Sequence, residues 1–193
     1  MKKAIILVLC FLLALSIAGC KDQPEKGPAD MTGGIISTSD YSVWSAYSTE
    51  KIMREEIDYA GKKAARLTMS GVKNEYESIQ LVITAKQNID SYNLIKSDLT
   101  DGKGNSISKE NVEIYNEWYV FVDQPATYYP QGSYPDGLVP MDLAEKAGEL
   151  KINENCNQGI WITVYIPDTP AGVYSGTFKL SVGGDSYDIP VEL

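Results

Sequence analysis

Hydrophobic and polar residues alternate along several stretches of the chain, and this pattern predicts β-strands. A period of two places every second side chain on one face, so that one face is buried and the other meets water or a second layer. The alternation is clearest over residues 65–69, 79–85, 160–166 and 174–182. Weaker strand patterns cover residues 42–46, 91–97, 112–122 and 187–193.

Short turn-forming segments separate these strands. Asp101–Asn105 and Gly183–Asp185 are rich in glycine and aspartate and predict tight connections. Only Leu143–Leu150 has helical character. About eight strands without alternating helices predict an all-β fold, an antiparallel β-sandwich spanning residues 41–193.

One longer connection interrupts the strand pattern. Residues 124–141 hold Tyr128-Tyr129-Pro130 and Tyr134-Pro135, followed by Asp136 and Gly137. Proline cannot donate a hydrogen bond inside a central strand, so we expect an ordered loop that lies over the sandwich or against another domain. Loops of this length are usually functional or interfacial.

The N-terminus has the features of an export signal. Lys2 and Lys3 precede an apolar run from Ala4 to Ala18, which is shorter than the roughly 20 residues that span a bilayer. The run ends in Leu15-Ser16-Ile17-Ala18-Gly19-Cys20, which resembles a bacterial lipobox. We therefore expect a signal peptide at 1–19, a lipidated tether at 20–40 with the lipid on Cys20, and a protein anchored to the bacterial membrane. The alternative is an ordinary cleavage site that happens to precede a cysteine.

Composition excludes several functions. The chain contains no histidine, so a Ser-His-Asp system or a His-ligated metal site cannot form within it. Its formal net charge of −9 argues against a nucleic-acid partner. Of its three cysteines, Cys10 leaves with the signal and Cys20 carries lipid, so Cys156 has no partner for an internal disulfide and we assign it no function. No cofactor or metal is expected.

Two groups of acidic residues could have a functional role, but a structural role is the interpretation that we prefer for both. Glu75 and Glu77 are two residues apart on one strand face, near the separation that paired carboxylates of glycosidases require. We expect them instead to satisfy local backbone donors. Asp98, Asp101 and Asn105 bracket a glycine turn, but their spacing does not match a calcium loop, which favours an Asx-type turn.

Sugar binding is a more serious possibility, because pyranose rings stack on aromatic side chains while their hydroxyls bond to carboxylates and amides. The candidate residues for glycan or interdomain contact are Trp118, Tyr119, Tyr128, Tyr129, Tyr134, Asp136 and Trp161, with Asn116, Asp123 and Gln131 as polar neighbours. The same aromatic residues are also typical of sandwich cores and of seams between domains. Alternation leaves open whether Trp161 faces a partner layer or solvent.

Three ordered motifs resemble a known family. They are residues 74–81 (Asn-Glu-Tyr-Glu-Ser-Ile-Gln-Leu), the segment from Tyr129 to Pro140, and residues 157–167 continuing to the Pro-Ala-Gly-Val-Tyr-Ser-Gly hairpin at 170–176. Together with Trp44 and Lys51 they resemble the N-terminal β-sandwich of bacterial glycoside hydrolase family 123.

The resemblance implies a noncatalytic domain. In that family a (β/α)8 barrel follows the sandwich and performs retaining, substrate-assisted hydrolysis of N-acetylgalactosaminides with an Asp-Glu pair. None of the barrel is present in this chain, which ends at Leu193 inside an expected strand. We therefore expect a fragment of a longer protein, with no catalytic residue of its own and the barrel as its partner. The alternatives are a self-sufficient carbohydrate-binding surface lipoprotein and a structural interaction domain of the envelope.

Overall fold

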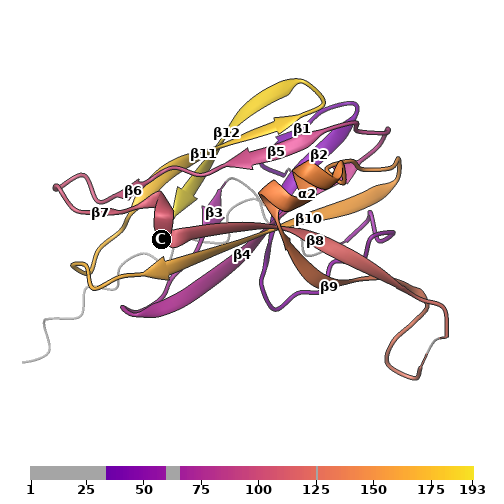
Figure 1. Ribbon diagram of the computed structural model, residues 1–193, viewed down its shortest axis with the longest axis horizontal. Coiled ribbons are helices and arrows are strands. Elements are labelled where there is room, and N and C mark those ends of the chain that lie inside the picture. Colours follow the sequence, from indigo (N-terminus) through magenta and orange to yellow (C-terminus); the bar gives the residue numbers. More distant parts are fainter. Residues whose placement is uncertain (1–33, 60–65, 125) are drawn as a thin grey trace, which may run out of the picture.

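The computed structural model describes residues 34–59, 66–124 and 126–193. Two β-sheets face each other and enclose the core (Figure 1), which confirms the predicted all-β sandwich. The first sheet has the order β1-β2-β4-β10-β8-β9, and the second has the order β3-β12-β11-β6-β7, with β5 also paired to β11. All pairs are antiparallel except β3 with β12. The predicted signal peptide, Cys20 and most of the predicted tether lie outside the described residues.

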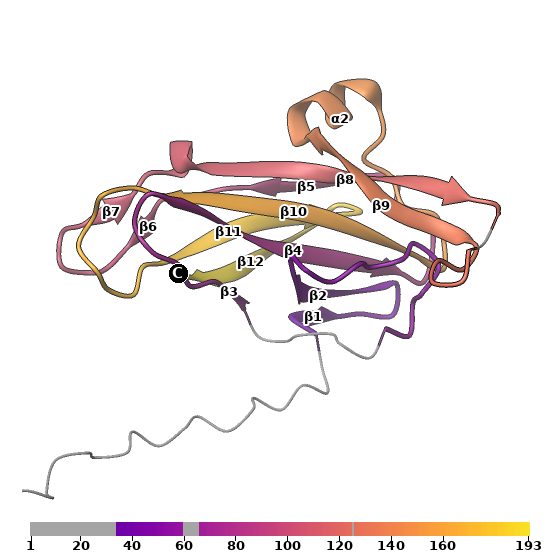
Figure 2. The same ribbon diagram turned by 90° about the horizontal axis from the view of Figure 1, so that it is seen from below.

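The strands of the first sheet are β1 (Ile36–Ser37), β2 (Tyr41–Tyr47), β4 (Glu75–Ala85), β10 (Cys156–Ile166), β8 (Val112–Val122) and β9 (Gly132–Pro140). Those of the second are β3 (Leu67–Thr68), β12 (Asp185–Glu192), β11 (Ser175–Val182), β5 (Tyr92–Ile95), β6 (Leu99–Thr100) and β7 (Ser106–Ile107). A 3-10 turn at Lys109–Asn111 leads into β8, and α2 (Met141–Ala147) lies outside the sandwich beside β8 and β9 (Figure 2). In the described residues, no helix is long and apolar enough to cross a bilayer.

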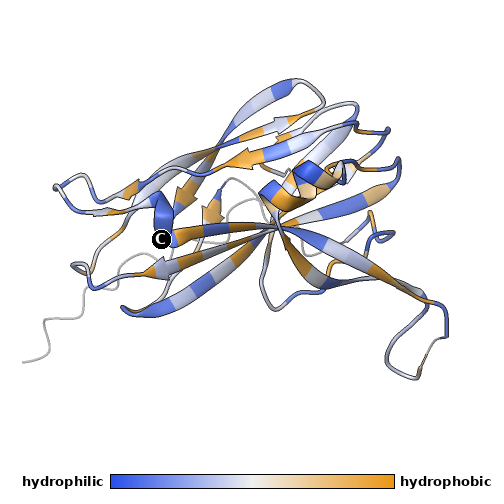
Figure 3. Cartoon of the chain, in the orientation of Figure 1, coloured by the Kyte–Doolittle hydropathy of each residue, from blue (hydrophilic) through white to orange (hydrophobic). Residues whose placement is uncertain are grey.

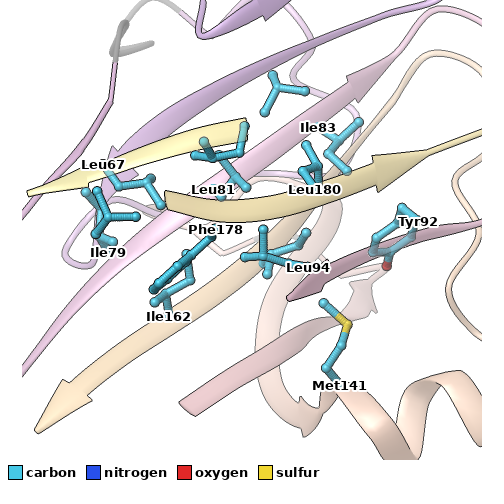
Figure 4. Packing of buried hydrophobic residues seen from close by; sticks show 14 of the residues in the cluster. Leu67, Ile79, Leu81, Ile83, Tyr92, Leu94, Met141, Ile162, Phe178 and Leu180 are labelled. Carbon is cyan, nitrogen blue, oxygen red and sulfur yellow. The ribbon is translucent and has the colours of Figure 1, made fainter. Parts of the chain in front are cut away.

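Alternation along the strands builds the core. In Figure 3 apolar and polar bands follow each other along β10 and β11, as the period of two requires. Leu81 and Ile162 of the first sheet pack against Phe178 and Leu180 of the second (Figure 4). These four side chains are fully buried, so the space between the sheets excludes water along its centre.

The structure corrects two predicted boundaries, those of the tether and of the helix. β1 pairs with β2 through Ile36↔Val43, so the folded domain begins inside the segment 20–40 assigned to the tether. The helix covers Met141–Ala147 rather than Leu143–Leu150, because Gly148 adopts a left-handed conformation with φ 75° and ends it. The Gly183-Gly184 turn agrees with its prediction, since both residues have positive φ and join β11 to β12 directly.

The largest correction concerns residues 124–141, which were expected to form a loop. Gly132–Pro140 is instead the edge strand β9, paired with β8 over its whole length. An edge strand tolerates Pro135 and Pro140 because one side of its backbone needs no partner. Trp118 pairs with Gly137 and Tyr119 with Pro135, which leaves Asp136 as the extra residue of a β-bulge.

Candidate functional site

The outer face of the first sheet carries a second, smaller apolar cluster beneath the segment 48–59. Trp44, Ala46 and Val82 from β2 and β4 are fully buried there under Ile52. The ring of Tyr59 stacks on Trp44 with 5.5 Å between centroids. The segment 48–59 therefore acts as a cover that converts an outward-facing sheet surface into interior, and we call it the cover segment.

Buried side-chain amides tie the cover segment to the sheet. The Asn157 amide nitrogen donates to the carbonyl oxygens of Met53 at 3.0 Å and Glu56 at 2.8 Å. Gln80 donates in the same way to the carbonyls of Tyr47 and Glu50, at 2.7 and 2.8 Å. A buried amide whose donors are all used fixes its partners, so the backbone of the cover is positioned by β4 and β10.

Strands β8 and β10 separate at this face. Their backbones pair as far as Asn116↔Ile160. Beyond that pair, hydrogen bonds that involve side chains take the place of backbone-to-backbone bonds. The Gln158 amide donates to the carbonyl of Glu117 at 2.9 Å, and the Gly159 N–H donates to the Tyr119 hydroxyl at 3.2 Å. We call this divergence the fork.

The cover segment enters the fork. The Asn157 N–H donates to the Arg54 carbonyl at 2.7 Å, while the Arg54 N–H donates to the Ser133 carbonyl at 3.1 Å. Arg54 thus bridges β10 and β9, and its guanidinium lies 5.1 Å from the centroid of the Tyr119 ring. The predicted candidate Tyr119 therefore helps to join the strands at the fork and does not present a free ring to a ligand.

Glu117 is a carboxylic acid buried at the fork with 3% exposure. A Cβ on Gly159 would overlap with its Oε2, so the carboxyl group occupies the space that a larger residue at 159 would fill. Burial raises the pKa of Glu117 to about 7, and a hydrogen bond with Tyr119 opposes part of that rise.

A cavity of about 230 Å³ opens beside Glu117, between the cover segment and β9. Its floor is formed by three neighbouring strands, through Gln80, Trp161 and Glu117, and its rim includes Lys51 and Asp136. In the described part of the chain, two buried side-chain oxygens have no hydrogen-bond partner, Gln80 Oε1 and Glu117 Oε2. Both belong to residues that line this one cavity, which we call the fork cavity.

The predicted aromatic candidates divide among three places. Trp161 and Asp136 line the fork cavity. Trp118 and Tyr119 border a second hollow of about 200 Å³ near Arg54. Tyr129 and Tyr134 border a third of about 420 Å³, which Lys51 and Asp136 also line. Tyr128, at the tip of the β8–β9 hairpin, is 87% exposed.

The structure settles the orientation of Trp161. Its partners in the sheet are Gln80 and Tyr115, and its ring is half-buried on the outer face. The indole N–H donates to Thr163 at 3.0 Å. The ring face, rather than the N–H, is therefore what Trp161 contributes to the cavity.

The predicted polar neighbours do not share one site. Asn116 is buried between the sheets, where its side-chain oxygen accepts hydrogen bonds from Tyr92 and Gln158. Asp123 and Gln131 are exposed on the hairpin. Asn116 is therefore a core hydrogen-bonding residue, and only Asp136 of this group lies at the fork cavity.

Other acidic groups have structural tasks. Glu75 accepts the Val72 N–H at a strand start. Asp101 accepts from Lys103 N, Asn105 N and Asn105 Nδ2, which is the Asx-type turn that the sequence favoured, and these bonds hold the pKa of Asp101 below its usual value. Cys156 is free and half-buried at the start of β10. Among the residues that the structure describes, no His/Cys/Asp/Glu group is arranged to hold a metal ion.

A larger cavity of about 590 Å³ lies near the end of β10, and it differs in character. It is lined by the Pro170–Tyr174 hairpin, Ile166 and Leu193. The hydroxyl of Tyr174 is already bonded to Thr169 and to the Pro170 carbonyl. Neither of the two residues with an unpaired oxygen lines this larger cavity.

Sequence reasoning missed Glu117, Gln80, Gln158 and Asn157. The available signals were an acid in the middle of the apolar strand 112–122 and a glycine, Gly159, inside a strong alternation. A glycine within a strand often marks the close approach of another group. Pairing the two signals required the register of β8 against β10, which a single sequence does not give.

Comparisons with known proteins identify a family and a similar fold. Residues 46–182 match the model of the glycoside hydrolase 123 N-terminal domain. The fold is similar to that of a family 123 glycoside hydrolase from Clostridium perfringens, whose structure was reported for glycolipid glycan hydrolysis, with a TM-score of 0.65 and 18% identity. The match covers 79% of this chain and 27% of that one, so the chain spans about a quarter of the length of that enzyme. Among curated proteins, none matches the chain.

Proposed function

Because the chain belongs to the glycoside hydrolase 123 N-terminal domain family, we propose that it is a noncatalytic sandwich that supports a carbohydrate-active catalytic domain. The family membership confirms the resemblance carried by the sequence motifs, and it establishes a glycoside hydrolase-related domain. The proposal adds three elements to that relationship: a docking surface, the lack of catalysis in this chain, and attachment to a membrane.

The observation that carries the proposal is the exposed apolar surface of the β8–β9 hairpin. The large hydrophobic side chains that it leaves open to solvent are Trp118, Val120, Phe121, Tyr128, Tyr129 and Leu138. The hairpin projects past the end of the second sheet (Figure 1), so no layer formed by the described residues covers its far end. Trp118 and Val120 alternate with Phe121 along β8, so both faces of the hairpin present apolar side chains. Exposed apolar surface of this kind is typical of an interaction site in soluble domains. A second domain of the same protein is the occupant that the family relationship favours.

The docking surface can be tested with the region of the source gene that follows codon 193. That region is expressed as a separate polypeptide and titrated with this chain by calorimetry. Phe121→Ser should weaken the association at least tenfold, because the side chain is 59% exposed on the hairpin. Ile95→Ser is the matched control, since Ile95 is 60% exposed on the opposite sheet and should leave the affinity unchanged. A stop codon directly after 193, or equal losses for both variants, contradicts the proposal.

The noncatalytic role is tested at Glu117, the acid among the described residues whose pKa burial raises to about 7. The purified chain should not hydrolyse aryl N-acetylgalactosaminides or other aryl glycosides. If it does, and Glu117→Gln abolishes the reaction while Glu75→Gln does not, this chain carries a catalytic site and the proposal is wrong.

Membrane attachment rests on the lipobox-like segment ending at Cys20. We expect export and lipidation of that cysteine, with the acidic body held clear of the bilayer. Metabolic labelling with an alkynyl fatty acid should mark the wild-type chain and the Cys156→Ser control, but not Cys20→Ser. Label on Cys20→Ser, or recovery of the wild-type chain only in the soluble fraction, excludes lipidation at this site.

A further inference from the structure

Arg54 carries a positive charge that has no acidic partner within the described residues. Its main-chain groups are bonded to β10 and β9, and its half-buried guanidinium lies over the ring of Tyr119. The four ion pairs of the described residues all join other side chains. Arg54 and Tyr119 both line the hollow of about 200 Å³, which we call the Arg54 hollow. A guanidinium presents a planar fork of N–H donors, and that fork matches a carboxylate.

Two buried amides bring further polar atoms to the same hollow. Asn116 and Gln158 line it and are only 3% and 2% exposed. The Gln158 nitrogen donates to the carbonyls of Glu117 and Gly159 and to the side-chain oxygen of Asn116, so this network fixes which end of each amide is the nitrogen. The atoms that remain without a partner in the described residues are the donor Asn116 Nδ2 and the acceptor Gln158 Oε1.

Solvent still reaches these two amide atoms. The unpaired side-chain atoms that are sealed from solvent in the described residues are Gln80 Oε1 and Glu117 Oε2, and neither amide atom is among them. Asn116 and Gln158 are nevertheless almost fully buried, so the small surface that they expose opens into the hollow that both line. A ligand in the hollow can therefore displace water and bond to both amides directly.

The balance of charge in the hollow favours an anion. Besides Arg54, its lining includes Lys151, Glu149 and Glu117. Lys151 and Glu149 are both exposed on the loop after α2, and their opposite charges largely offset each other at the rim. The carboxyl group of Glu117 is packed against Gly159, where burial raises its pKa and so weakens its repulsion of an anion. The half-buried charge of Arg54 therefore dominates the hollow.

The size and the polar groups of the hollow define the ligand. A volume of about 200 Å³ lies below the roughly 300–1,000 Å³ of sites for drug-sized ligands, so a molecule of only a few heavy atoms fits. We propose that the Arg54 hollow binds a small hydroxycarboxylate, with its carboxylate on the Arg54 guanidinium and Asn116 Nδ2 and its hydroxyl donating to Gln158 Oε1. This binding site goes beyond the supporting role proposed above and does not depend on it.

The test is a nuclear magnetic resonance titration of the purified chain with glycolate, acetate, glycolamide and methylammonium. Glycolate at millimolar concentration should give saturable shifts of the Arg54 Nε–H and the Asn116 side-chain amide. Acetate lacks the hydroxyl and should bind about threefold more weakly, and glycolamide, which lacks the charge, should bind at least about tenfold more weakly. Methylammonium should shift neither group. Absence of glycolate shifts, or equal affinities for glycolate and glycolamide, overturns the proposal.

Variants locate the site and test its charge. Arg54→Gln removes the guanidinium, leaves the main-chain bonds of the cover segment in place, and should weaken glycolate binding at least about tenfold. Arg66→Gln is the matched control, because Arg66 pairs with Glu192 outside the hollow and should leave the affinity unchanged. At low ionic strength Glu149→Gln should tighten binding about twofold, and Lys151→Gln should weaken it about twofold. Wild-type affinity in Arg54→Gln, or the reverse order of the two rim variants, contradicts the proposal.

An acidic side chain of a docked domain would present the same carboxylate, and two measurements separate it from a free acid. If the ligand is a free hydroxy acid, glycolate binds more tightly than acetate, and Arg54→Gln leaves the affinity unchanged in the docking titration proposed above. If a carboxylate of the docked domain fills the hollow, the two anions bind equally and Arg54→Gln weakens docking. The second result overturns this proposal while it supports the docking role, so the two proposals fail separately.

Discussion

The two faces of the first sheet are buried in different ways. Its inner face presents Leu81 and Ile162 to the second sheet, and apolar contact supplies the stability there. Its outer face is buried by the cover segment, through a small apolar cluster edged by the amides of Gln80 and Asn157. Apolar contact is non-directional, whereas amide bonds demand particular partners. The inner face therefore holds the fold together, and the outer face positions groups, including two oxygens left without partners.

The largest effect is expected at the inner face. Phe178→Ala removes a fully buried ring from the centre of the core and should lower the free energy of unfolding by about 3–5 kcal/mol. Urea denaturation followed by circular dichroism measures the change. A loss below about 1 kcal/mol would show that the inner face is not the main source of stability.

The next effect is a pH dependence at the outer face. Burial raises the pKa of Glu117 from its ordinary 4.5 to about 7, so between these values the folded chain binds more protons than the unfolded one. Stability should then fall as pH rises from 4.5 to 7, by on the order of 3 kcal/mol. Urea midpoints measured across this window should fall more steeply for the wild type than for Glu117→Gln, which cannot titrate. Parallel curves for the two proteins would mean that Glu117 titrates normally.

A steric test follows at the fork. Gly159→Ala places a methyl group against the Glu117 carboxyl and should destabilise the fold by about 1–3 kcal/mol. The double variant with Glu117→Ala should recover part of that loss, because the added methyl group then has space. Additive losses in this double-mutant cycle would argue against contact between the two positions.

The cover segment gives a more local effect. Asn157→Ala removes the donors to Met53 and Glu56 and should cost about 1–3 kcal/mol. Limited proteolysis should then cut within residues 48–59 faster than in the wild type, while the core strands stay protected. Asn93→Ala, on β5 of the other sheet, is a control that should leave the cleavage rate unchanged.

The smallest effect is expected at an exposed ion pair. Lys179 and Asp188 lie 3.0 Å apart on the outward side of the second sheet, and both are well exposed. Such pairs contribute about 0–1 kcal/mol, so Lys179→Ala should change the urea midpoint very little. If Lys179→Ala lowers the free energy of unfolding as much as Asn157→Ala does, exposed and buried polar contacts contribute equally to stability and the comparison fails.

The sequence predicted the inner face well because alternation is a local property. Residues 160–166 and 174–182 carry the period of two, and both are strands whose apolar positions lie in the core. β9 was missed because its prolines suggest a loop, and only the absence of a neighbour beyond β9 makes a strand possible there.

The fork cavity lay beyond sequence reasoning for a different reason. Gln80, Glu117 and Trp161 come from three strands that are distant along the chain, and their meeting depends on the registers Trp161↔Gln80 and Trp161↔Tyr115. Trp161 and Asp136 were selected by residue type alone. Residue type alone can select Trp161 as a candidate, but the position of Glu117 near it follows only from the register of the strands.

The separation of β8 from β10 has a mechanical consequence. Past Asn116 the hairpin is a two-stranded ribbon, and such ribbons twist more freely than wide sheets. The base of this ribbon is held by hydrogen bonds from Gln158, to Tyr119 and through Arg54. These bonds therefore set the angle between the ribbon and the rest of the sandwich. Whatever sits on the ribbon inherits its orientation from those three side chains.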